Sequence, residues 1–210
     1  MNLEYWDEFK DDKQFFKDIH SFTDNVLQVF IDEAQWLPGF EKTKRSAWRE
    51  RSIGIGVMGF HQYLQATNLP FGSLSSRYIN TNIFTRIKQM FEATNKELGH
   101  EKGFAPMSFT KRNVHVTAVA PTASISTLCN LSSPGIDPRV ANIYTAKTNI
   151  GAYTIKNKYL DKLITNHIDG SIGNTKAKAD WLAEQWKSIL KNEGSVQHLD
   201  WMDDADKEVF

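Results

Sequence analysis

Apolar side chains recur every three or four residues in several parts of the chain, and this spacing predicts amphipathic helices. The longest case is residues 13–35, where Phe15, Ile19, Phe22 and Val26 share the spacing. Residues 75–98 show the same pattern, and Gly99 is expected to end that helix. Shorter helices are expected at 60–65, 159–164 and 181–190, and the acidic tail from Asp200 onward starts another helical pattern.

Strict alternation marks a different kind of element in the middle of the chain. Small apolar side chains recur at every second position along 113–120, as in a β-strand that is buried on at least one face. Pro121 is expected to end this strand, because proline has no N–H to donate to a neighbouring strand. The run at 52–59 carries glycines that would allow a neighbouring backbone or side chain close approach. Two further β-rich runs, 142–144 and 152–155, flank a turn. The mixture predicts an α/β protein.

The stretch after Pro121 is the candidate binding loop. It consists of small and hydroxyl-bearing residues: Thr122, Ala123, Ser124, Ile125 and Ser126. Such a turn can direct several backbone N–H groups and hydroxyls to one point and so bind an anion, particularly if a helix starts there. The alternative is an ordinary turn or helix N-cap. No Gly-Lys pair of a Walker loop is present, so the residues alone leave both interpretations open.

Composition narrows the class of protein. Of 210 residues, 40% are hydrophobic, and 25 basic residues balance 25 acidic ones, which gives no electrostatic footprint for nucleic acid or an anionic membrane. The N-terminus is unlike a signal peptide and no apolar run approaches membrane-spanning length, so a soluble, cytoplasmic protein without a membrane partner is expected.

The single cysteine, Cys129, excludes a disulfide within the chain and favours a reducing compartment. Its leucine neighbours, Leu128 and Leu131, favour a buried, inert thiol.

Other chemistry is sparse. The six histidines have no metal-ligand spacing, so no metal site is expected. Gly54, Gly56 and Gly59 contain G-x-G without the rest of a dinucleotide fingerprint, and there is no G-x-S-x-G elbow. The basic stretch at 42–51 is expected to be a solvated loop, with phosphate or partner contact as the alternative.

Several longer motifs carry a family resemblance. They are AVAPTASIS followed by SPGIDP, the preceding RERSIGIGVMGFHQYLQ, and the later NIYTAKTNIGAYTIKNKYLDKLI and GSVQHLDWMDDADKEVF. Together with the opening NLEYWDEF they resemble the large, catalytic subunit of class I ribonucleoside-diphosphate reductase, as found in bacteria and large phages. The related cobalamin-dependent class is an alternative, but the flanking segments resemble class I more.

The resemblance implies a fold and a site. Residues 1–210 would be one incomplete domain, a partial segment of the ten-stranded α/β barrel of ribonucleotide reductases. The loop matching Thr122, Ala123, Ser124, Ile125 and Ser126 would bind the diphosphate of the substrate through backbone N–H groups and hydroxyls. The run at 52–59 would be a barrel strand.

The resemblance also implies what this chain does not supply. The finger loop with the thiyl-radical cysteine, the two redox cysteines, the ATP-cone and the C-terminal tail match nothing here, so no residue, Cys129 included, is assigned a catalytic role. The reaction in the family needs three active-site cysteines and this chain has one. We therefore expect a part of a ribonucleoside-diphosphate reductase that is inactive alone.

Its expected partners follow from the family. They are a complementing chain with the active-site cysteines, a metal-containing small subunit that supplies the radical, thioredoxin or glutaredoxin as reductant, and a ribonucleoside diphosphate as substrate. No cofactor is expected in this chain itself. The alternative is a truncated, non-catalytic remnant or binding module.

Overall fold

A computed structural model describes residues 1–148, 151–169 and 174–210. The chain forms two compact units, each made of two stretches of sequence. The first unit contains Met1–Phe60 and Arg77–Ile136, and the second contains His61–Ser76 and Asp137–Phe210. The turn predicted around residues 149–151 and part of the polar stretch at 165–175 fall largely outside the described residues.

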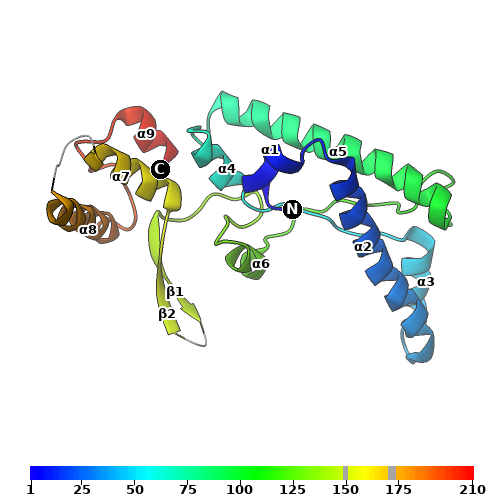
Figure 1. Cartoon of the computed structure of the whole chain (residues 1–210). Coiled ribbons are helices and arrows are strands. Elements are labelled where there is room, and N and C mark those ends of the chain that lie inside the picture. The colour runs from blue at the N-terminus through cyan, green and yellow to red at the C-terminus, as the bar shows by residue number, and fades with distance from the viewer. Residues whose placement is uncertain (149–150, 170–173) are drawn as a thin grey trace. The chain divides into compact units, whose positions relative to one another are not determined.

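Helices dominate the first unit (Figure 1). The helix expected at 13–35 is confirmed as α2, Lys13–Glu33, whose N-cap residue Asp12 accepts hydrogen bonds from two backbone N–H groups of the first turn. The long helix α5 spans Leu74–Lys102. The remaining elements are η1 Leu3–Tyr5, α1 Trp6–Phe9, η2 Ala34–Trp36, α3 Glu41–Glu50 and α6 Ala123–Leu128.

Two sequence expectations about helices were wrong. The basic stretch at 42–51 is not a loop but forms most of α3, and Arg51 ends that helix in a left-handed conformation. Gly99 does not end α5, which continues to Lys102. Its role is packing, because a Cβ at Gly99 would lie 2.5 Å from the ring of Phe104. The positive φ of the helix end falls instead at Gly103, where φ is +88°.

The predicted strands of the first unit are extended but sparsely paired. A single parallel bridge joins Ile55 to Thr117, and another joins Asn2 to Met58. Three short segments of chain therefore run parallel, with residues around 55–58 between the N-terminus and residues 115–118. The described residues are mostly helical, with one regular two-stranded sheet, so the α/β prediction is confirmed in part.

The second unit contains that sheet, an antiparallel hairpin as the sequence predicts. Strand β1, Ile143–Thr148, pairs with β2, Gly151–Lys156, so that Tyr144 lies opposite Ile155. The core of this unit is formed by Ile143, Leu160, Ile164, Trp186 and other buried apolar residues. Its helices are α7 Lys158–Asp169, α8 Thr175–Lys191, α9 Asp204–Val209 and α4 Phe60–Ala66, whose first residue ends the first stretch of the first unit.

Candidate functional site

The candidate loop follows one of the parallel extended segments. The backbone N–H of Ile55 donates to Val116 at 2.8 Å, and the N–H of Ala118 donates back to Ile55 at 3.2 Å. Glycines make this approach possible. A Cβ at Gly56 would lie 2.6 Å from the carbonyl oxygen of Ala118, and one at Gly54 would lie 3.0 Å from the Ala118 Cβ. The sequence prediction that these glycines serve close packing is confirmed.

After this segment the chain turns sharply into α6. Thr122 has left-handed torsions, φ 49° and ψ 27°, and the helix begins at Ala123. The N–H of Ser126 donates to the carbonyl of Thr122 at 2.8 Å. The N–H groups of Ala123, Ser124 and Ile125 precede that bond and belong to the first turn, which has no intrahelical acceptor for them. They point out of the helix start, the arrangement that favours an anion.

The hydroxyl groups of the loop have different roles. Thr122 Oγ1 accepts from the backbone N–H of Gly135 at 2.7 Å, which leaves its own proton available as a donor. Ser124 is exposed. Ser126 is 3% exposed and its hydroxyl donates to the Ala123 carbonyl at 3.1 Å. The structure therefore brings the five predicted residues together, but the Ser126 hydroxyl is directed into the fold.

Residues distant in sequence hold the loop from behind. Asn2 Nδ2 donates to Ser132 Oγ at 2.8 Å, and that hydroxyl donates to the Cys129 carbonyl at 2.7 Å. The N–H of Ser132 also donates to the Ser126 carbonyl at 2.9 Å. Gly59, with φ +79°, lies so close that a Cβ there would be 2.3 Å from Asn2 Oδ1. Sequence reasoning missed Asn2 and Ser132, and only the glycine at 59 hinted at a close approach.

Cys129 is exposed, so the predicted buried thiol was wrong. The cause is the shortness of α6. Ser126 occupies the buried side of this helix, whereas Leu128 is 85% exposed. Cys129 follows as the C-cap residue. The leucine neighbours that suggested burial are themselves on the surface.

A buried charged cluster connects the helices to the start of the extended segment at 114–118. Both Asp24 oxygens are hydrogen-bonded: Oδ1 to the Arg51 guanidinium at 2.8 and 3.1 Å, and Oδ2 to Arg112 Nε at 3.0 Å. Asn113 Nδ2 donates to Asp24 Oδ1 at 3.0 Å and to the Arg51 carbonyl at 2.7 Å. Burial raises the pKa of Asp24, but hydrogen bonds from Arg51, Asn113 and Arg112 outweigh it and the pKa is lowered overall.

His20 completes the cluster. Its Nε2 lies 2.9 Å from Asn113 Oδ1 and its Nδ1 lies 2.9 Å from Thr94 Oγ1. Because Asn113 uses its amide nitrogen for Asp24, the oxygen faces the ring, and Nε2 must carry the proton. Burial lowers the pKa of His20, which favours this neutral form. The cluster contains no group with an open coordination or substrate position, so its role is structural.

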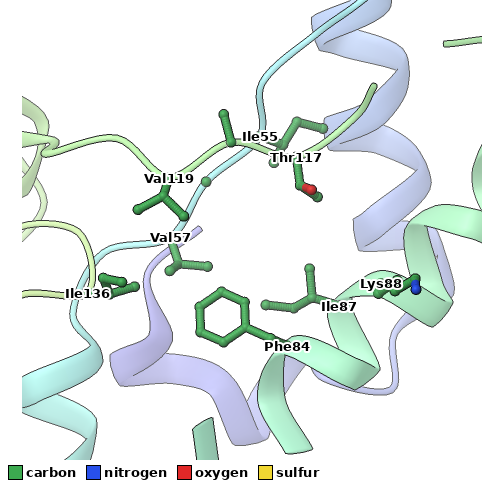
Figure 2. A pocket seen from close by; sticks show the side chains of 10 residues that line it. Ile55, Val57, Phe84, Ile87, Lys88, Thr117, Val119 and Ile136 are labelled. Atoms are coloured by element: carbon green, nitrogen blue, oxygen red, sulfur yellow. The ribbon is translucent and has the colours of Figure 1, made fainter. Parts of the chain in front are cut away.

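A cavity of about 170 Å³ lies between α5 and the extended segments. Figure 2 shows Phe84 and Ile87 projecting from α5 toward Val57, with Lys88 at the edge. The lining is mostly apolar and includes none of the residues from 122 to 126. This cavity is therefore separate from the candidate anion loop.

Residues 1–148, 151–169 and 174–210 hold no group of three or more potential metal-ligating side chains. No helix within the same ranges is long and apolar enough to cross a bilayer.

The described residues form mostly helices, with short parallel extended segments and a sharp turn into the short helix α6. The family profile "Ribonucleotide reductase, barrel domain" matches residues 4–111 and 107–210. The chain belongs to this family, as part of the large subunit.

Individual relatives agree. The ribonucleoside-diphosphate reductase large subunit of Invertebrate iridescent virus 3 is 38% identical over 212 residues, covering all of this chain and 32% of the viral protein. That of Invertebrate iridescent virus 6 is 37% identical, covering all of this chain and 21% of its own. The solved class Id ribonucleotide reductase alpha subunit of Actinobacillus ureae superposes with a TM-score of 0.86 at 33% identity, covering all of this chain and 36% of that chain.

Proposed function

We propose that this chain is the part of a ribonucleoside-diphosphate reductase that holds the diphosphate of the substrate. The reaction is the reduction of a ribonucleoside diphosphate to the deoxyribonucleoside diphosphate. The observation that supports the proposal is the start of α6: the first-turn N–H groups of Ala123, Ser124 and Ile125 lie at a helix start that follows the left-handed Thr122, and Ser124 is exposed there. Charge-assisted hydrogen bonds from such donors suit phosphate oxygens.

The thiol chemistry must come from elsewhere. The chain spans about a third of the length of the Invertebrate iridescent virus 3 protein, at 32%. Its single cysteine is exposed at the end of α6 and has no base in hydrogen-bond contact among the described interactions. We infer that a complementing chain supplies the radical and redox cysteines, that a metal-containing small subunit supplies the radical, and that thioredoxin or glutaredoxin restores the thiols.

The test is binding of inorganic pyrophosphate and of ADP to the whole chain, measured by calorimetry. Ser124→Asp places a carboxylate among the donors. It should lower pyrophosphate affinity at least tenfold because like charges repel, while the helix keeps its stability, since an acidic residue is favourable at a helix N-terminus. Thr127→Asp adds the same charge at the other end of α6 and should weaken binding much less. Equal affinity of Ser124→Asp and the unsubstituted chain would remove the loop from the site.

A further inference from the structure

Helix α2 has apolar side chains on two opposite faces. One face is buried and includes Phe16 and Ile31. The other carries Phe22, Val26 and Val29, which are 71%, 56% and 61% exposed. At about 100° per residue these three positions fall within a sector of about 60°, and that sector is centred on the side opposite the buried one. A helix that is apolar on both faces is normally covered on both.

The exposed apolar surface continues beyond α2. Trp36 in η2 is 76% exposed and Trp48 in α3 is 52% exposed. A hollow of about 350 Å³ lies between these elements, lined by Leu37, Lys44 and Trp48 among others. Helix α2 contacts both η2 and α3, and Figure 1 shows α3 beside the lower part of α2. Exposed tryptophans beside a hollow are typical of the anchor positions of protein interfaces.

The parallel extended segments of the same unit also lack the continuous pairing of a regular sheet. Only two bridges, Asn2 with Met58 and Ile55 with Thr117, join the three segments among the described residues. Parallel strands are found almost only in sheets covered on both faces, and a barrel has no open edge. Relatives that this chain matches are about three to five times as long, since it covers 32%, 21% and 36% of three of them. Protein of the same family is therefore the expected cover.

We propose that the α2 stripe, defined as Phe22, Val26 and Val29, is a docking surface for a helix from the part of the reductase large subunit that lies outside residues 1–210. The inference rests on the proposed function, because it assigns the contact surface for the complementing chain named there. A stripe with i, i+4, i+7 spacing forms a single ridge, which fits into the groove of one partner helix. The stripe is opposite the side of α2 that packs on the charged cluster of Asp24, so docking leaves the cluster undisturbed.

The experiment measures association between this whole chain and a probe chain. The probe consists of the portions of the Invertebrate iridescent virus 3 large subunit that lie outside the matched segment, and the readout is the dissociation constant from biolayer interferometry. Phe22→Lys with Val26→Lys should raise the dissociation constant at least tenfold. The matched control, Asn80→Lys with Asn82→Lys, adds the same charge at exposed polar positions of α5 and should change it less than twofold. Thermal melting of each variant checks that the chain still folds.

The other outcomes separate the two proposals. If the complex forms and the stripe variant binds as tightly as the control, the docking surface is wrong while the complementing chain stands. If the unsubstituted chain forms no complex at all, the complementing-chain proposal fails together with its surface. If this chain alone is a dimer by analytical ultracentrifugation and the stripe variant alone is monomeric, the stripe serves a second copy, which also overturns the inference.

Discussion

At the scale of single residues, the stability of the first unit depends on charged side chains that are buried from solvent. Asp24 has a side chain that is 1% exposed, and it forms ion pairs with Arg51 and Arg112, whose side chains are 5% and 10% exposed. Each partner comes from a different part of the chain. Such a cluster stabilises the fold only while it is complete, because removing one member leaves the others buried without a counter-charge.

Asp24→Asn should therefore be severe. It keeps the size of the side chain but removes the only acidic partner described for the two guanidinium groups, and a loss of about 3–5 kcal/mol in the free energy of unfolding is expected. Asp18→Asn, the same change at an exposed position of α2, should cost less than about 0.5 kcal/mol. Chemical denaturation of both variants makes the comparison. A small effect at Asp24 would show that the cluster is not coupled to folding.

Gly59 is the residue that both the backbone and its neighbours require to be glycine. Its φ is +79°, and a Cβ would lie 2.3 Å from Asn2 Oδ1. Gly103 has a similar φ of +88° but nothing within 4 Å of a Cβ, so it isolates the backbone effect. Gly59→Ala should lower the unfolding free energy by about 2–4 kcal/mol and Gly103→Ala by about 1 kcal/mol. Equal losses would mean that the contact with Asn2 does not constrain the position.

At the scale of elements, local patterns predicted what local forces determine. The spacing of Phe15, Ile19 and Phe22 predicted α2, and the β-rich runs predicted the hairpin. The local sequence pattern failed where contacts between residues distant in sequence determine the structure. The charges at 42–51 suggested a solvated loop, yet the segment is helix α3 and its end is tied to Asp24 through Arg51. Gly99 reads as a stop in sequence, but it is a contact point for Phe104.

The candidate site likewise combines features that the local sequence indicates with features that depend on contacts between distant residues. The composition of residues 122–126 left an anion loop and an ordinary turn or helix N-cap both open, and only the family resemblance favoured the anion loop. Its support was not predictable, since Asn2 and Ser132 are 130 residues apart in sequence. Nor could the sequence separate the outward Ser124 hydroxyl from the inward Ser126 hydroxyl, which depends on the direction in which α6 leaves the turn.

Helix α4 carries a prediction about pH. Burial, with the positive charge of Arg139 adding to it, lowers the pKa of His61 from 6.5 to about 4. The neutral ring accepts a hydrogen bond from the Arg139 N–H at 3.0 Å, and protonation at that nitrogen would remove this acceptor. The unfolded chain takes up the proton first, so stability present above pH 6.5 is lost as the pH falls toward 4, by about 3 kcal/mol in all.

The measurement is an NMR titration of the His61 ring together with denaturation of the second unit at several pH values. His61→Asn keeps an acceptor for the Arg139 N–H without a titrating ring, and it should flatten the loss between pH 6.5 and 4. A midpoint for His61 near 6.5 would contradict the role of burial.

At the scale of the whole molecule, the chain covers 36% of the Actinobacillus ureae subunit and all of itself. It contains a loop at the start of α6, a helix with a second apolar face, and short extended segments joined by two bridges among the described residues. The proposed function assigns this part of the large subunit to the diphosphate of the substrate and the reduction itself to another chain.

The most direct measurement is reduction of CDP, followed as deoxycytidine product. The assay combines this chain, the portions of the Invertebrate iridescent virus 3 large subunit that lie outside its matched segment, that virus's small subunit and a dithiol reductant. We expect product only when all of them are present, and much less with Ser124→Asp. Product from this chain and the small subunit alone would contradict the account, because a single cysteine would then be sufficient.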